Sequence, residues 1–110
     1  HSFWQDQRWR RFAVKVANVG PTDEVLDVAC GTGDLTRAFA KARPKRVLGV
    51  DFTTEMLDIA RARRVRDEQS GSAPAVITSY AEGDATKLAF ADASFDVLSI
   101  AFGIRNVGEP

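Results

Sequence analysis

The sequence predicts an α/β fold in which a parallel β-sheet lies between layers of helices, a three-layer αβα arrangement. The first observation is an apolar run at residues 25–28 that leads through Gly31 and Gly33 into a helical repeat. The second is an apolar run at residues 47–50 that ends in Asp51, about 20 residues past the glycine turn. Because apolar runs and helical repeats alternate in this way, we expect βαβ units.

Length and composition limit the classes of protein to which the chain can belong. It has 110 residues, enough for one small domain. Its formal net charge is zero, which gives no basis for binding nucleic acid. Cys30 is the single cysteine and His1 the single histidine, so we expect no disulfide, no metal site and no Ser-His-Asp or Cys-His mechanism. With no apolar run near the roughly 18 residues of a membrane span and no signal peptide expected, the prediction is a cytoplasmic protein.

The first 19 residues are expected to form an amphipathic helix. Its buried face is predicted from apolar residues at helical spacing, which are Trp9, Phe12, Ala13 and Val16. The basic residues of this helix are expected on its other faces. There they are either solvated or in contact with an anion or a lipid headgroup.

Residues 34–42 are predicted to form the helix that follows the glycine turn. Pro44 ends it, because the residue before a proline disfavours helical angles. The second strand is expected over about residues 46–50 and the fourth over residues 95–100, apolar on both faces as in a covered parallel sheet. Between them, a loop at residues 70–74 is expected to precede a third strand at about residues 76–80.

A further helix is expected from about residue 53 to residue 69, because Thr53 is a suitable N-cap residue. Met56, Ile59 and Ala60 are predicted to form its inner face, and its four arginines are expected to face solvent. Met56 has two interpretations: it packs in the core, or it forms a soft wall against an adenine ring.

The glycine turn favours a nucleoside ligand, although a lone G-x-G pattern is compatible with a turn that binds nothing. A dinucleotide site would require a third glycine where this chain has Thr36. Asp34 stands where a pyrophosphate would rest on the helix N-terminus, and its carboxylate would repel phosphate. The sulfonium and ammonium groups of S-adenosylmethionine are instead favoured by Asp27 and Asp34. A nicotinamide-binding domain remains the alternative.

Candidate binding residues gather where the predicted strands end. Asp27, Asp51, Asp84 and Ala101 lie near the carboxyl ends of four strands, where open α/β sheets bind ligands. Asp51 occupies the position of the acid that binds a ribose in nucleotide-binding βαβ units. Asp84 can accept a hydrogen bond from an adenine amino group while the Ala85 amide faces a ring nitrogen. Its alternative role is a turn or a helix cap.

Four segments carry a family resemblance. Residues 25–36 contain Leu-Asp-Val-Ala-Cys-Gly-Thr-Gly-Asp-Leu-Thr, residues 51–57 follow the second strand, and residues 101–107 read Ala-Phe-Gly-Ile-Arg-Asn-Val. The Trp-Arg-Arg at residues 9–11 also fits. Together these segments resemble the class I S-adenosylmethionine-dependent methyltransferases. Within that class they resemble the C-methyltransferases that act on demethylmenaquinone or a ubiquinone precursor, and residues 101–107 are the most specific match.

The resemblance implies a Rossmann-like fold, S-adenosylmethionine as cofactor, no metal, and methylation of a quinone ring carbon. The implied cofactor positions are Gly31, Thr32, Gly33, Asp51, Asp84, Ala85 and Ala101. Asp27, Phe52 and Met56 complete the candidate cofactor-binding residues. Ala101 has no hydroxyl where relatives often carry serine. Arg105 is expected to act on the quinone, by stabilising a phenolate or by ordering a water that takes the proton. Otherwise it is a loop arginine bonded to local carbonyls.

The resemblance also implies a truncated domain, because this family's sheet has about seven strands and we count about four. We expect one partial methyltransferase domain, an N-terminal fragment with a helix in residues 1–19 and the cofactor-binding half in residues 20–110. Its fourth strand is expected to be an apolar edge that pairs with a second copy, giving a homo-oligomer, or else leaves the isolated chain poorly stable. Peripheral membrane contact suits a quinone substrate. The alternatives are a methyltransferase for another apolar small molecule and a non-catalytic, self-associating α/β module.

Overall fold

The computed structural model describes residues 7–83, 95–100 and 103–106. Its elements, in chain order, are α1 Gln7–Ala17, β1 Glu24–Val28, α2 Asp34–Lys41, β2 Arg46–Asp51, α3 Thr54–Gln69, α4 Ala73–Val76, β3 Thr78–Glu82, β4 Val97–Ile100 and β5 Gly103–Asn106. The strands form one sheet in the order β3-β2-β1-β4-β5. The first four are mutually parallel, which confirms the predicted α/β class, and β5 is antiparallel to β4.

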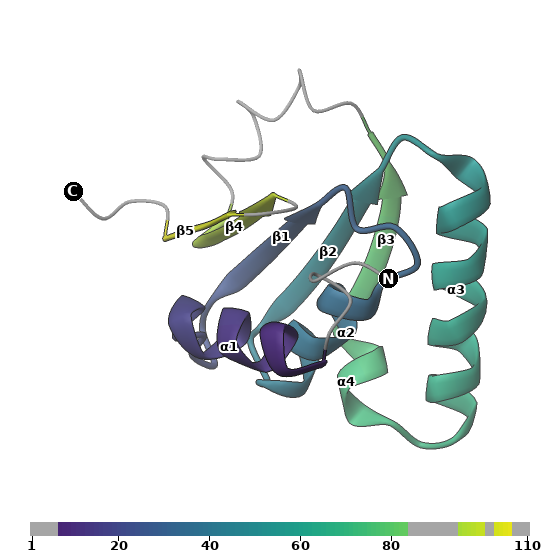
Figure 1. Ribbon diagram of the computed structural model, residues 1–110. Helices are drawn as coiled ribbons and strands as arrows, with labels where there is room; N and C mark the ends of the chain where they lie inside the picture. The colour runs from purple at the N-terminus through teal and green to yellow at the C-terminus, as the bar shows by residue number, and fades with distance from the viewer. Residues whose placement is uncertain (1–6, 84–94, 101–102, 107–110) are drawn as a thin grey trace.

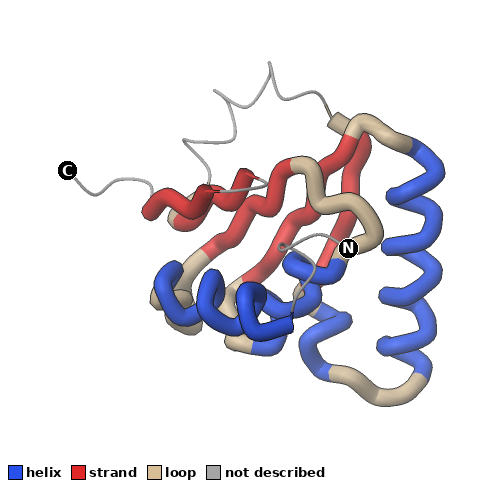
Figure 2. Tube along the Cα trace, in the orientation of Figure 1, coloured by secondary structure: helices blue, strands red, loops and turns tan. Residues whose placement is uncertain are grey.

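The described helices pack on one face of the sheet. α1 contacts α2 and β5, α2 lies over β1 and β2, and α3 packs against β3 and α4 (Figure 1). In Figure 2 these helices gather on one side of the strands, and a loop at the end of β1 leads into α2. The described residues therefore hold one helical layer of the predicted three-layer arrangement.

The sheet buries apolar side chains on both faces, as its continuous apolar runs predict. On the helical face, Val25 and Val47 pack with Phe39 of α2 and Ala17 of α1. On the opposite face, a second cluster comprises Leu26, Val28, Leu48, Val50, Phe95 and Leu98. Successive residues of a strand point to opposite faces, so Asp27 lies on the same face as Val25, beneath α2.

Several large side chains that were predicted to be buried on the inner faces of α1 and α3 are exposed, so that part of the prediction was wrong. In α1 the buried residues are Ala13 and Ala17, while Phe12 is 63% exposed. In α3 the buried residues are Leu57 and Ala60, and Met56 is 43% exposed. Val16 and Ile59 are also exposed. Because Met56 is exposed and its neighbour Leu57 is buried, the core-packing interpretation of Met56 is excluded.

The segment before β3 also differs from the prediction. Residues 73–76, expected to be the end of a loop and the start of a strand, form the short helix α4, with Pro74 in its first turn. Thr78 begins β3, and its hydroxyl donates to the carbonyl oxygen of Pro74 at 2.8 Å. Val76 is consequently exposed rather than buried in the sheet.

The prediction that β4 forms a free edge was wrong. β5 pairs antiparallel with β4, from Ile100↔Gly103 to Val97↔Asn106. The residues that carry the most specific part of the family resemblance thus supply a fifth strand. A homo-oligomer formed through the β4 edge would require β5 to be displaced.

Candidate cofactor site

The glycine turn between β1 and α2 is held in a conformation that favours glycine. Gly31 has φ of 57° and Gly33 has φ of 89°, both in the left-handed region. The Cys30 N–H donates to the Val50 carbonyl oxygen at 3.1 Å, and the Gly33 N–H donates to the Cys30 carbonyl oxygen at 3.0 Å. A Cβ on Gly31 would meet no atom within 4 Å, so the backbone here is open to a ligand.

Gly33 faces the protein interior instead. A Cβ on Gly33 would lie 2.4 Å from the hydroxyl oxygen of Tyr80, a contact that real side chains do not tolerate. The second glycine is therefore required for packing of the turn against β3, and the first leaves the ligand side open.

Asp51 joins the glycine turn to the start of α3. Its Oδ2 accepts a hydrogen bond from the Gly31 N–H at 2.9 Å, and its Oδ1 accepts one from the Thr53 N–H at 2.9 Å. The side chain is 8% exposed and lies at the carboxyl end of β2. Each carboxylate oxygen has a second lone pair, so Asp51 is oriented by the backbone and can still accept from a ligand hydroxyl.

Asp27 lies below the turn and is fully enclosed. Its Oδ2 accepts a hydrogen bond from the Thr36 hydroxyl at 2.6 Å. The pKa of Asp27 is raised to about 6, chiefly by burial; the hydrogen bonds from Thr36 and Ser99 oppose the rise, and the charge of Asp51 adds to it. Asp27 thus links β1, α2 and β4 beneath the glycine turn.

Cys30 and Tyr80 are buried beside the turn without ionising. Burial raises the pKa of the Cys30 thiol to about 12, which excludes a nucleophilic thiolate at neutral pH. Burial likewise raises the pKa of Tyr80. Its hydroxyl is buried and has no hydrogen-bond partner among the described residues.

Arg63 of α3 reaches across to the far side of the turn. Its Nη1 donates to the Thr32 carbonyl oxygen at 3.1 Å and lies 2.9 Å from Oδ1 of Asp34. The arginine was expected to face solvent, and that expectation was wrong. It fixes Thr32 and partly neutralises the acid at the N-terminus of α2.

The predicted site residues outside the turn and its two buried aspartates fall into three groups by position. Near Asp51, Phe52 is 76% exposed and Met56 is exposed on the first turn of α3. Asp84, Ala85 and Ala101 lie outside the described residues. Arg105 lies in β5, paired with Leu98, two residues before β4 ends at Ile100. Its backbone is therefore in a strand, not a loop, and it is not level with the rim that carries Asp51.

Sequence reasoning missed three residues that organise the turn. Thr36, considered only as a missing third glycine, holds Asp27, and Ser99 occupies the register position beside it. A polar residue in an apolar strand was an available signal for Ser99. Nothing in the sequence pointed to the contact of Arg63 with Thr32.

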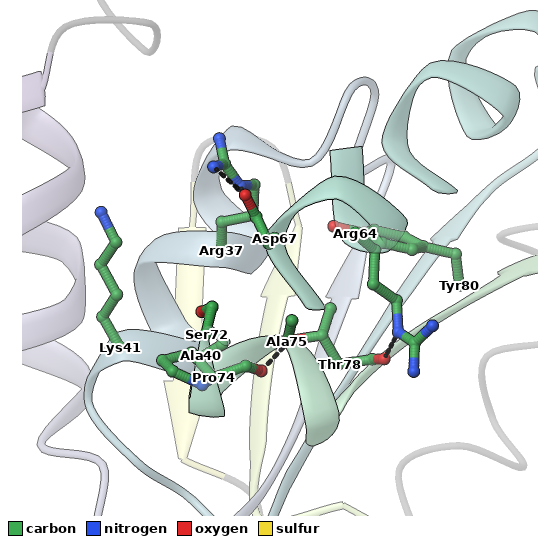
Figure 3. A pocket seen from close by; sticks show the side chains of 10 residues that line it. All are labelled: Arg37, Ala40, Lys41, Arg64, Asp67, Ser72, Pro74, Ala75, Thr78 and Tyr80. Atoms are coloured by element: carbon green, nitrogen blue, oxygen red, sulfur yellow. Dashed lines mark hydrogen bonds and ion pairs between the residues drawn. The ribbon is translucent and has the colours of Figure 1, made fainter. Parts of the chain in front are cut away.

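A cavity of about 220 Å³ lies away from the strand ends, between α2, α3, α4 and β3. Figure 3 shows the Arg37–Asp67 ion pair at one side and Arg64 bonded to Thr78 at the other. It does not include the glycine turn or Asp51. In the part of the chain that the structure describes, no cluster of acids, histidines and cysteines is suited to a metal. Nor is any helix there long and apolar enough to span a bilayer.

Comparison with known families gives one match along the whole chain. The sequence model of the ubiE/COQ5 methyltransferase family matches residues 1–110. A relative named ubiquinone/menaquinone biosynthesis C-methyltransferase UbiE, from Geobacter sp. strain M21, is 41% identical over 104 residues, 93% of this chain and 42% of its own. The demethylmenaquinone methyltransferase of Renibacterium salmoninarum is 41% identical over 109 residues, 99% of this chain and 41% of its own. The chain thus spans about two-fifths of the length of these relatives.

Solved structures resemble the fold. The YcgJ protein from Bacillus subtilis aligns with a TM-score of 0.71 and 26% identity, over 86% of this chain and 38% of its own. A putative methyltransferase from Bacillus halodurans aligns with a TM-score of 0.65 and 32% identity, over 83% of this chain and 36% of its own. The second of these is described as a putative methyltransferase, and both share the arrangement of strands and helices seen here.

Proposed function

The chain belongs to the ubiE/COQ5 methyltransferase family, and on that premise we propose that it is the cofactor-binding part of an S-adenosylmethionine-dependent C-methyltransferase acting on a quinone precursor. The observation that carries the proposal is Asp51, a buried carboxylate at the end of β2 that two backbone N–H groups orient beside an open glycine turn. The quinone class comes from the names of the relatives, which are enzymes of ubiquinone, menaquinone or demethylmenaquinone methylation.

The residues present fit the cofactor. Gly31 leaves its backbone accessible, and Asp51 keeps free lone pairs that suit ribose hydroxyls. Asp27, Asp34 and Asp51 surround the turn with carboxylates, which favours a ligand with positive centres. The exposed Phe52 and Met56 beside Asp51 offer apolar surface to an adenine ring.

The remaining assignments follow the family resemblance. Thr32 with Gly31 and Gly33 would hold the methionine end, and the Arg63 bond to Thr32 would fix that loop. Asp84 and Ala85 would bind the adenine, and Ala101 would line the site without a hydroxyl. Asp27 would act from below, by holding α2 through Thr36.

The main role of the protein in this reaction would be to position the cofactor and the quinone and to exclude water. When bound, S-adenosylmethionine supplies a methyl group on a positively charged sulfur. The chain's residues would hold the quinone ring carbon in line with that methyl, and such orientation contributes much of the rate. Arg105 would stabilise the phenolate of the reduced quinone or order the water that takes its proton. A cytoplasmic protein in peripheral contact with the membrane would meet such an apolar substrate.

A nicotinamide-binding domain fits less well. Thr36 occupies the third fingerprint position and donates its hydroxyl to the buried Asp27, so this position is used for internal structure. Asp34 places a carboxylate at the N-terminus of α2, where a pyrophosphate would bind. Titration with NADH is expected to give no saturable binding.

Titration calorimetry with S-adenosylhomocysteine tests the cofactor site. We expect saturable binding to the wild type and at least a tenfold increase in Kd for Asp51→Asn, or about 1.4 kcal/mol. Asp58→Asn, an exposed aspartate on α3, is the matched control and should bind as the wild type does. Circular dichroism confirms that each variant is folded. Equal affinity of Asp51→Asn and the control would contradict the assignment.

The identity of the methyl acceptor is tested separately, in a chimeric protein. Residues 1–110 replace the matching segment of a full-length relative, and methyl transfer to a short-chain demethylmenaquinol is measured. We expect turnover that Asp51→Asn lowers and Asp58→Asn does not. A folded chimera that binds S-adenosylhomocysteine but methylates only other apolar phenols would contradict the quinone assignment and leave the cofactor site intact.

A further inference from the structure

A second cavity, of about 530 Å³, forms a groove between α1 and α2. Asp51 and the glycines of the turn do not line it, so it adjoins the cofactor site only at Asp34 and Arg63. Three helices contribute six basic side chains to its lining, which are Arg10, Arg11 and Lys15 of α1, Arg37 and Lys41 of α2, and Arg63 of α3. Asp34 is the single acid among the described residues that line it.

The groove exists because α1 and α2 meet through small residues. Ala13 and Ala17 are the buried residues of α1, and they bring that helix close to its neighbours. Ala38 and Ala42 of α2 line the groove together with Val14. Short side chains leave the space open, and the long basic ones form its rim.

Positive charge in the groove exceeds what the neighbouring acids neutralise. Arg63 is paired with Asp34 at 2.9 Å and Arg37 with Asp67 at 3.0 Å. Within the described residues, Arg11, Lys15 and Lys41 form no ion pair, and α1 contains no acid. Since the chain has a net charge of zero, this concentration of cations is a local feature of one face.

We propose that the groove between α1 and α2 binds a phosphate group. Phosphate offers several acceptor oxygens, which suit the fixed donors of arginine and the point charge of lysine. The cavity volume is in the range of small-ligand sites. Because the Asp34 carboxylate repels an anion at the N-terminal end of α2, the phosphate lies toward Lys41 at the other end of that helix. A soluble phosphate compound and a phospholipid headgroup share this chemistry.

Calorimetric titration with inorganic pyrophosphate at low ionic strength tests the groove. The triple variant Arg11→Gln/Lys15→Gln/Lys41→Gln removes three positive charges from its rim. The matched control Arg43→Gln/Lys45→Gln/Arg66→Gln removes three exposed positive charges elsewhere. We expect the groove variant to bind at least tenfold more weakly than the wild type and the control to bind within twofold of it. Circular dichroism checks that both variants remain folded.

Cosedimentation with vesicles separates the two sources of phosphate. Binding to phosphatidylglycerol vesicles, absent with phosphatidylcholine and lost in the groove variant, identifies a lipid headgroup. Pyrophosphate binding without vesicle binding identifies a soluble ligand, and each result supports the proposal. Equal weakening of the groove variant and the control, or binding of neither probe by the wild type, would overturn it.

Discussion

At the scale of single residues, Asp27 beneath the glycine turn makes the stability of the folded protein depend on pH. Its pKa is raised from 3.8 to about 6 in the folded protein, chiefly by burial. A folded protein that binds the proton more tightly than the unfolded chain is stabilised below the unfolded pKa. It loses that stability as pH rises through the folded pKa. For a shift of about two units in the pKa of Asp27, the free energy of unfolding falls by roughly 3 kcal/mol between about pH 4 and pH 6.

The variant Asp27→Asn should remove this pH dependence. Asparagine keeps an oxygen that accepts the Thr36 hydroxyl and carries no charge, so its unfolding free energy is expected to vary less over the same range. Urea unfolding at intervals between pH 4 and pH 7 measures the difference. Asp58→Asn, in an exposed position, should retain the slope of the wild type. An unchanged slope in Asp27→Asn would show that another group is responsible.

At the scale of elements, α3 protects the outer edge of the sheet. The Val47 N–H donates to the Ile77 carbonyl, so the alternating carbonyls of Thr78 and Tyr80 point away from β2. Arg64 donates to Thr78, and Arg61 donates to Tyr80 at 3.3 Å. Spaced one turn apart, these two arginines satisfy the carbonyls of an edge strand.

Replacing Arg64 with methionine should therefore destabilise the protein. The apolar stem is kept and the donor lost, so we expect the free energy of unfolding to fall by about 1 kcal/mol. Arg66→Met, on an exposed position of the same helix, is the control and should change it little. Chemical unfolding followed by circular dichroism measures both. A similar loss in both variants would mean that Arg64 acts only through helix propensity or net charge.

The helices also show where sequence patterns stop being informative. Apolar spacing identified α1 and α3 correctly as helices but selected Phe12 and Met56 as buried, and both are exposed. Ala13 and Ala60 were predicted correctly, but Leu57 is buried in place of its neighbour Met56, because spacing alone does not fix which of two adjacent apolar residues faces the sheet. The arginines of α3 contact carbonyls of a strand that follows them, and no local pattern encodes such pairing.

At the scale of the whole molecule, β5 changes how the sheet meets solvent. The expected free edge of β4 is paired with residues of the same chain. Among the described strands the outermost on this side is β5, a four-residue strand that contains Arg105, and short charged strands discourage pairing between copies. We therefore expect the protein to sediment as a monomer.

The variant Ile104→Pro tests the role of β5. Proline fixes φ and removes an N–H, so β5 should detach and expose β4. We expect concentration-dependent self-association in analytical ultracentrifugation, while Ile104→Val stays monomeric. A monomeric Ile104→Pro protein with intact circular dichroism would mean that β5 does not protect this edge.

The parallel sheet and the glycine turn were predictable because both depend on neighbouring residues. The apolar runs at residues 25–28 and 47–50, and the positive φ of Gly31 and Gly33, all leave local signals. The contacts that support the turn leave no such local signal. Asp27 is held by Thr36 and Ser99, and Thr32 is held by Arg63. These contacts join separate elements and exist only once the sheet has formed.

The central position of β1 has a consequence for synthesis of the protein. Glu24, in β1, contacts Arg46, 22 residues later, on one side and Asp96, 72 residues later, on the other. On a ribosome, β2 and β3 can join β1 early, but β4 is made roughly 50 residues after β2, or about 3 to 10 s later at typical rates. Throughout that interval, the middle strand of the finished sheet is an open edge on the nascent chain. A ribosome-associated chaperone would find its binding surface there.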